Sequence, residues 1–235
     1  MRRSGPNTDD SLIVGPAEHC VDRAIAAVLF DYGGVVADEG FQAGVSAIAI
    51  AQGYPADAFF EAAREAVYAT GYVVGRASEA EFWATVRERY PLSGSDGELT
   101  SAILQRFVLR PAMLAAVRRL RRQGIRCALL SDQTDWLDRL ERRDGFFREF
   151  DRIYNSYRIG KSKRDASLFD DVVAKLDLPA QKVVFIDDTL GHVERARARG
   201  LRAIHFVDTD QCLDTLGGLV GLSLRVADPS GRQTT

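Results

Sequence analysis

An apolar run ends abruptly at an aspartate near the start of the chain. Residues 24–30 (AIAAVLF) contain no polar side chain, and Asp31 then opens the turn Tyr32-Gly33-Gly34. A continuous apolar run of this length is typical of a strand that is buried on both faces of a parallel sheet. The sequence therefore predicts a strand whose carboxyl end places the Asp31 carboxylate beside a tight turn.

An alternation of strands and helices follows in the second half of the chain. Four further strands are predicted, at 125–131, 152–155, 182–186 and 202–206. Helices are predicted beside them, at 111–123, 167–176 and 191–199. Strands that alternate with helices form a parallel sheet covered on both faces, with right-handed crossovers. The expected fold class is α/β, with a Rossmann-like parallel sheet as its core.

The segment between the first two predicted strands shows only helical patterns. From about residue 41 to 107, apolar side chains recur every three or four positions, which is far too long a stretch for an ordinary strand-to-helix connection. We therefore predict a helical cap domain at 41–107, inserted into a core domain made of 23–40 and 108–225. Residues 1–22 and 226–235 are predicted to form a flexible leader and a flexible tail.

The charge balance and the cysteines limit the classes of partner. Lys and Arg total 31 against 33 Asp and Glu, so the formal charge of -2 supplies no general field to attract nucleic acid or an anionic membrane. The apolar runs are too short to cross a bilayer, and the spacing of the three cysteines suits neither a disulfide framework nor a zinc cluster. We predict a cytoplasmic protein that binds neither nucleic acid nor membrane. The sequence gives no indication of its oligomeric state.

Polar side chains follow three of the predicted strands: Asp31, Ser131 and the pair Asp187-Asp188. Because ligands of open α/β sheets bind outside the carboxyl ends of the strands, these residues can converge despite their distance in sequence. Three carboxylates in one crevice repel one another unless a cation is present. The ion that best suits them is Mg²⁺, which is commonly held by carboxylates, water and substrate phosphate.

The same crevice contains the groups that a phosphate needs. The backbone N–H groups of the turn 32–34 and the hydroxyl of Ser131 can orient it, and either Lys161 or Lys163 can add positive charge. The sequence therefore predicts a phosphorylated ligand.

On these residues the chain resembles the haloacid dehalogenase (HAD) superfamily of hydrolases, in the group whose helical cap follows the first strand. The four family motifs are matched in order by LFDYGGVVAD (29–38), CALLSDQ (127–133), GKSKRDASLF (160–169) and VVFIDDTLGHVERARARG (183–200). The resemblance implies a HAD-like α/β core with an inserted α-helical cap. In the third motif, the spacing to Phe169 favours Lys163 over Lys161.

The resemblance also implies a role for each motif residue. The implied catalytic residues are Asp31 as the nucleophile, Ser131 and Lys163. The implied phosphate-binding residues are Tyr32, Gly33, Ser131, Asp132 and Lys163. The implied ligands of Mg²⁺ are Asp31, the carbonyl of Gly33, Asp187 and Asp188.

Five positions depart from the family pattern. Gly33 stands where most phosphatases of the family have a second aspartate, whose proton transfer typically contributes about 10²–10⁴-fold to the rate. Asp132 replaces an asparagine and would bring negative charge near the phosphate. Arg164 and Ala166 replace two prolines, and His192, which we interpret as a supporting or surface residue, replaces an asparagine.

Segments 73–90 and 109–124 are similar to the sugar-phosphatase branch that includes alpha-D-glucose-1-phosphatase. The resemblance implies a Mg²⁺-dependent phosphomonoester hydrolase that acts on a small phosphorylated metabolite, such as a sugar phosphate, through an aspartyl-phosphate. Gly33 and Asp132 keep an alternative open, a catalytically silent member that binds a phosphorylated ligand or a protein partner. A 2-haloacid dehalogenase is less favoured, because that chemistry does not use the metal that the aspartate pair suits.

Overall fold

The computed structural model describes residues 24–225, so the leader and tail predicted at 1–22 and 226–235 lie outside the described residues. One sheet of five parallel strands has the order β3-β2-β1-β4-β5. Its strands are β1 (Ala27–Phe30), β2 (Arg126–Ser131), β3 (Arg152–Asn155), β4 (Val183–Asp187) and β5 (Arg202–His205). The predicted α/β fold with a parallel sheet is confirmed, and strand bounds differ from the predicted ones by at most three residues.

The central strand β1 explains the uninterrupted apolar run of the sequence. It is paired with β2 on one side and β4 on the other, and all four of its residues are buried. Val28 and Phe30 belong to the apolar cluster on one face of the sheet, whereas Ala27 and Leu29 belong to the cluster on the other. A polar residue at any of these four positions would be buried without water, which is why none interrupts the strand.

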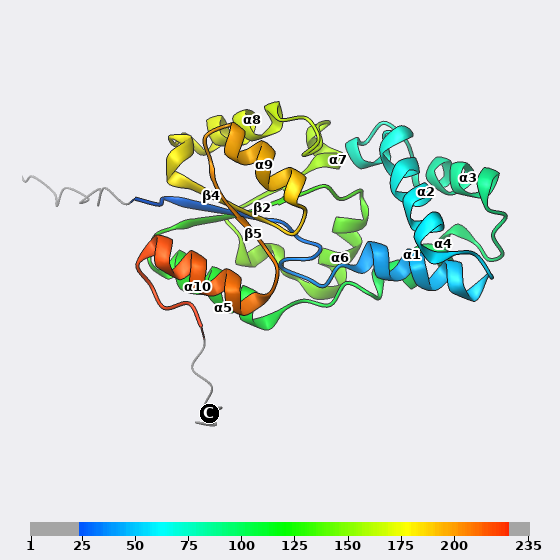
Figure 1. Cartoon of the computed structure of the whole chain (residues 1–235), viewed down its shortest axis with the longest axis horizontal. Helices are drawn as coiled ribbons and strands as arrows, with labels where there is room; N and C mark the ends of the chain where they lie inside the picture. The colour runs from blue at the N-terminus through cyan, green and yellow to red at the C-terminus, as the bar shows by residue number, and fades with distance from the viewer. Residues whose placement is uncertain (1–23, 226–235) are drawn as a thin grey trace, which may run out of the picture.

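Helices cover both faces of the sheet (Figure 1). α5 (Pro111–Arg122) and α10 (Thr209–Val220) pack against the face of Val28 and Phe30, and α8 (Ser167–Leu176) and α9 (Leu190–Ala198) cover the opposite face. The side chains of α8 that face the sheet form an apolar stripe of Leu168, Phe169 and Val172, whereas α9 adds Ala196 to the same cluster. Within residues 24–225, every helix is too short or too polar to span a bilayer.

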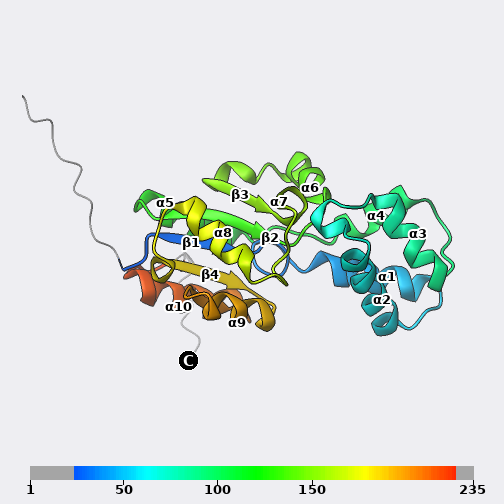
Figure 2. The same ribbon diagram turned by 90° about the horizontal axis from the view of Figure 1, so that it is seen from above.

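The long connection between β1 and β2 is helical, as predicted. It contains α1 (Gly40–Ala51), α2 (Ala56–Ala69), the 3₁₀ turn η1 (Tyr72–Val74), α3 (Glu79–Arg89) and α4 (Asp96–Leu104). These helices lie beyond the end of the sheet toward which the strands point (Figure 2). Their buried side chains continue the apolar cluster that contains Phe30. The division of the chain into cap and core domains stays a prediction.

Three helices were not predicted from the sequence: α6 (Trp136–Asp144), the one-turn α7 (Ser156–Ile159) and α10. Charged residues dominate α6, and its first residue follows Asp135, which makes no side-chain capping hydrogen bond. α10 contains two adjacent glycines, which are poor helix formers. Both helices are held by tertiary burial, through Trp136 and Leu140 in α6 and through Leu213 and Leu216 in α10.

The turn after β1 is anchored by the ring of Tyr32, which is fully buried. The ring stacks on Phe146 with a centroid distance of 4.7 Å and on Phe107 with a centroid distance of 5.7 Å. Within the described part of the chain, its hydroxyl is buried without a hydrogen-bond partner, and burial raises the pKa of the phenol. The aromatic stack therefore fixes the turn at the expense of one unpaired hydroxyl.

Helix α1 begins after Glu39, whose carboxylate accepts a hydrogen bond from the Gln42 backbone N–H at 2.6 Å. Burial raises the pKa of the Glu39 carboxyl to about 7, against the opposing effect of this hydrogen bond. The nearby negative charge of Asp188 acts in the same direction as burial. The folded state therefore binds the Glu39 proton more tightly than the unfolded chain does.

Replacing Tyr32 with Phe is expected to raise the free energy of unfolding by about 1 kcal/mol. The substitution keeps the ring stack and removes an unpaired buried hydroxyl, a feature that costs about 1–3 kcal/mol. Urea denaturation of Tyr32→Phe and the wild type at one pH measures the difference. A loss of more than about 1 kcal/mol would show that the hydroxyl has a partner in the folded protein.

Because the folded state holds the Glu39 proton more tightly, this group makes the protein less stable as the pH rises from about 4.5 to about 7. Glu39→Gln lacks this proton. We expect the stability of the variant relative to the wild type to increase by about 1–3 kcal/mol across that window and to level off above it. Denaturation of both proteins at several pH values measures this; a constant difference would contradict the assignment.

Candidate functional site

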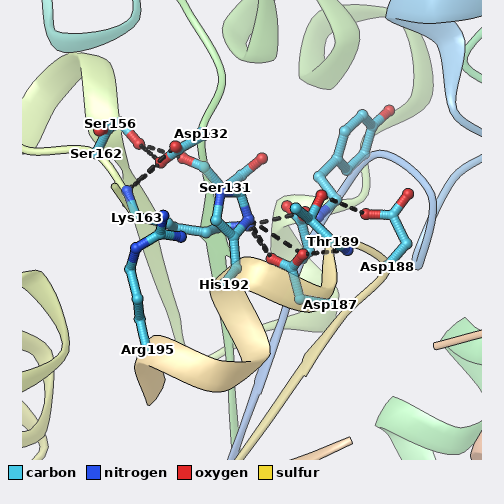
Figure 3. Close-up of polar contacts among 12 residues, drawn as sticks. Ser131, Asp132, Ser156, Ser162, Lys163, Asp187, Asp188, Thr189, His192 and Arg195 are labelled. Carbon is cyan, nitrogen blue, oxygen red and sulfur yellow. Dashed lines mark hydrogen bonds and ion pairs between the residues drawn. The ribbon is translucent and has the colours of Figure 1, made fainter. Parts of the chain in front are cut away.

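The topology brings the predicted strand-end residues to one edge of the sheet. Asp31 follows β1, Ser131 ends β2, and Asp187 ends β4 and is followed by Asp188. Because β1 lies between β2 and β4, these positions are neighbours although they are far apart in sequence. Figure 3 shows the labelled side chains of this group facing a common centre.

Lys163 occupies the middle of this group. Its Nζ lies 2.8 Å from Asp31 Oδ2 and 2.6 Å from Asp187 Oδ2, and its side chain is completely buried. The competing candidate, Lys161, instead pairs with Asp171 on α8. The structure therefore places Lys163, and not Lys161, among the carboxylates.

Burial and the neighbouring charges shift the pKa values of the three aspartates in this group. Burial raises the pKa of Asp31 well above its usual value; Lys163 opposes this, while the charges of Asp187 and Asp188 add to it. Burial also opposes ionisation of Asp187, but Lys163 and His192 outweigh burial and hold the Asp187 pKa well below its ordinary value. The pKa of Asp188 is raised by burial and then by the charge of Asp187.

The donor set fits a hard divalent cation. Asp31, Asp187 and Asp188 each offer a carboxylate oxygen, and these oxygens lie within 4.8 Å of one another. Three carboxylates face one lysine, so the fully ionised cluster carries surplus negative charge that a divalent cation would neutralise. Oxygen donors of this kind suit Mg²⁺.

The glycines of the turn allow it to lie close to this cluster. Gly34 has a φ of 80°, and a Cβ there would lie 1.9 Å from Asp188 Oδ2, so no other residue fits this position without displacing the carboxylate. Gly33 lines the same cavity as Asp31. The turn contributes only backbone groups here: the Tyr32 N–H donates to Asp31 Oδ1 at 2.6 Å, while the Tyr32 ring is buried in the aromatic stack.

Asp132 has a contact that the sequence analysis did not anticipate. Its carboxylate accepts hydrogen bonds from the Lys163 backbone N–H at 2.8 Å, from Ser156 Oγ at 2.5 Å and from the Tyr68 hydroxyl at 3.0 Å. Ser156 Oγ is also 2.8 Å from the carbonyl oxygen of Ser131. Asp132 therefore holds the Lys163 loop in place, and its predicted contact with phosphate stays a prediction.

Two further residues support the site. His192 Nδ1 lies 3.2 Å from Asp187 Oδ1, which fits the supporting role expected for this histidine. Arg110, which sequence reasoning missed, directs Nη1 at the carbonyl oxygens of Gly34 and Val35 and places its guanidinium over the Phe206 ring. Nothing in the local sequence of Arg110 signals this role, because all of its partners come from distant parts of the chain.

A cavity of about 360 Å³ opens onto Asp31 and Asp188. One part of its lining consists of the site residues at the strand ends and at the start of α9. The apolar part consists of Phe41, Phe60, Val67, Val73, Phe107 and Trp136. The remaining polar lining includes Glu39, Gln42, Arg64, Gln133, Thr134, Arg164 and Arg195.

Two curated proteins are similar in sequence to part of the chain. The chain is 35% identical over 72 residues to drimenol cyclase drtB of Aspergillus calidoustus, covering 31% of this chain and 14% of the relative. It is 33% identical over 72 residues to sesquiterpene phosphatase astK of Aspergillus oryzae, covering 31% of this chain and 37% of the relative. The matches thus span well under half the length of these curated relatives.

Among solved structures, a HAD family enzyme from Bacteroides thetaiotaomicron, in complex with magnesium and inorganic phosphate, superposes with a TM-score of 0.63. The match covers 80% of this chain and 98% of that one at 20% identity, and it shows a shared fold. The family model of the haloacid dehalogenase-like hydrolases matches residues 25–200. This match spans most of the sequence, including all four strand-end motifs, and the chain belongs to the haloacid dehalogenase-like hydrolase family.

Proposed function

We propose that this hydrolase is a Mg²⁺-dependent phosphomonoesterase that acts on a small phosphorylated metabolite. The observation that carries the proposal is the buried Lys163 ammonium in contact with both Asp31 and Asp187 at the carboxyl edge of the sheet. Support also comes from the relative named as a sesquiterpene phosphatase and from the structural neighbour crystallised with magnesium and inorganic phosphate.

Asp31 is the nucleophile of the proposed reaction. Its carboxylate attacks phosphorus, the ester oxygen leaves, and water then hydrolyses the aspartyl-phosphate. Lys163 opposes the rise that burial causes in the Asp31 pKa and so favours the ionised nucleophile; with the Ser131 hydroxyl, it would balance and orient the phosphoryl oxygens. Mg²⁺ held by Asp31, Asp187, Asp188 and the Gly33 carbonyl would neutralise charge on those oxygens.

The organic part of the substrate would lie in the cavity beside the carboxylates. Gln42, Gln133 and Thr134 supply polar groups there that suit the hydroxyls of a sugar phosphate, the substrate favoured by the sequence analysis. The cavity volume of about 360 Å³ is that of a small-molecule site. A small metabolite, rather than a protein surface, is thus the proposed substrate.

Phosphate release from a metabolite panel tests the proposal. With Mg²⁺ present, the protein should release phosphate, and EDTA should abolish the release. Asp31→Asn should lower the rate by at least about 10³-fold, because it removes the nucleophile. Asp177→Asn, at an exposed aspartate after α8, is the matched control and should retain full activity.

Release that survives both EDTA and Asp31→Asn would contradict this mechanism. If no substrate is turned over but a phosphorylated metabolite raises the melting temperature, the chain is the catalytically silent binder considered above, since a ligand bound only by the folded state stabilises it. Chloride release from 2-chloropropionate without metal would instead identify a dehalogenase.

Gly33→Asp tests whether the site lacks a proton donor. A Cβ at Gly33 would meet only the Phe107 ring, at 3.2 Å, and Gly33 lies outside the left-handed region of φ, so the turn can accept a side chain with a small shift of that ring. We expect a rate gain below the usual range of about 10²–10⁴-fold, because the added carboxylate also lies near Asp31.

The gain should be larger for a sugar phosphate than for p-nitrophenyl phosphate, whose leaving group needs little protonation. Gly33→Asn is the control of similar size without an acidic proton, and it should give no gain. Equal gains on both substrates, measured at matched Mg²⁺, would show that protonation of the leaving group is not what the site lacks.

A further inference from the structure

Two arginines line the cavity without a carboxylate partner among residues 24–225. Arg195 donates from Nη1 to the Gly191 carbonyl at 2.8 Å, which holds its guanidinium at the first turn of α9, on the His192 side of the site (Figure 3). Arg164 directly follows Lys163, and its guanidinium carbon lies 3.3 Å from the centroid of the Tyr68 ring. Both positive charges are thus available to an anion in the cavity.

Three acidic groups of the site, Asp31, Asp132 and Asp187, are engaged by other donors. The Lys163 ammonium forms ion pairs with the carboxylates of Asp31 and Asp187. The Asp132 carboxylate accepts three hydrogen bonds from other donors. The third arginine of the cavity lining, Arg64, differs from the other two because it pairs with Glu61 on its own helix. Arg164 and Arg195 are therefore suited to bind an anionic group of the substrate in addition to the phosphoryl group that is transferred.

The residue at position 33 restricts the chemistry of the leaving group, and this observation is independent of the two arginines. Gly33 has no proton to give, so position 33 cannot protonate the leaving group, and this favours a leaving group that is stable as an anion. An alkoxide is strongly basic and leaves poorly without protonation. A phosphate monoester, whose second pKa is about 6, is stable as an anion near neutral pH. The absence of an acid at position 33 and the guanidiniums of Arg164 and Arg195 in the cavity lining both suit a leaving group that is itself a phosphate.

We propose that the substrate is an organic diphosphate, from which the site removes the terminal phosphoryl group. The proposal rests on the phosphatase function proposed above and narrows its substrate class. Asp31 forms a bond to the terminal phosphorus, and the bond from that phosphorus to the bridging oxygen breaks. The electron pair stays on the bridging oxygen, and the organic monophosphate leaves as an anion bound by Arg164 and Arg195.

Water then attacks the aspartyl-phosphate, releases inorganic phosphate and loses a proton to solvent. The net reaction consumes one diphosphate and one water and yields one monophosphate and one phosphate. The apolar part of the lining favours a hydrocarbon, rather than the sugar considered above, as the organic substituent. Its side chains come from α1, α2, η1, α6 and the segment before α5, and they are Phe41, Phe60, Val67, Val73, Trp136 and Phe107.

The test compares n-octyl diphosphate with n-octyl phosphate, using p-nitrophenyl phosphate as the reference, all with Mg²⁺. We expect kcat/KM for octyl diphosphate to exceed that for octyl phosphate by about 10²-fold, with octyl phosphate accumulating as the product. Arg164→Gln and Arg195→Gln should each lower the ratio of kcat/KM on octyl diphosphate to kcat/KM on p-nitrophenyl phosphate by about tenfold. Arg119→Gln, at an exposed residue of α5 outside the cavity, is the matched control and should leave the ratio unchanged.

Similar kcat/KM values for the two octyl substrates would overturn the proposal, as would an unchanged ratio in both arginine variants of the cavity. Circular dichroism of each variant confirms that it is folded. The reference substrate distinguishes a failure of the proposed phosphatase function from a failure of the proposed substrate class. If neither octyl substrate nor p-nitrophenyl phosphate is hydrolysed, the proposed phosphatase function fails; if p-nitrophenyl phosphate is hydrolysed without a preference for the diphosphate, only the substrate class fails.

Discussion

The buried Lys163 ammonium is the group on which the arrangement of the site depends. It is completely buried and contacts Asp31 and Asp187, whose like charges would otherwise repel each other at the ends of adjacent strands. Removing one partner of a buried ion pair typically costs about 3–5 kcal/mol, because the remaining charge is left uncompensated. The same ion pairs that stabilise this edge of the sheet also set the charge of the proposed nucleophile.

The position of Lys163 is in turn fixed through its backbone. The Asp132 carboxylate accepts hydrogen bonds from the Lys163 backbone N–H and from the Ser156 hydroxyl. Its third donor, the Tyr68 hydroxyl, lies on α2. A helix of the segment between β1 and β2 therefore contacts the residue that holds the lysine loop. Two more polar contacts join this segment to the region after β2, from Tyr72 to Asp135 and from Trp136 Nε1 to Glu79 at 2.6 Å. Through these contacts, the helices that cover the cavity also brace the site beneath it.

Sequence reasoning recovered those features that local patterns encode. The apolar run before Asp31 indicated a strand buried on both faces, and the spacing to Phe169 selected Lys163, which the structure places between the carboxylates. The partners of Asp132 and Arg110 could not be predicted, because they arise from contacts between segments that are far apart in the chain. α10 was missed for a related reason: its paired glycines disfavour a helix locally, and burial of Leu213 and Leu216 stabilises it in the fold.

In the proposed reaction Asp31 carries the phosphoryl group during turnover, and mass spectrometry of an acid-quenched reaction can detect it there. Protein mixed with Mg²⁺ and a substrate that it hydrolyses is quenched in acid, digested and searched for peptides whose mass has increased by one phosphoryl group. We expect this addition on the peptide that contains Asp31, and no addition in Asp31→Asn. A phosphoryl group on another residue, or phosphate release at the full rate without any phosphorylated peptide, would contradict it.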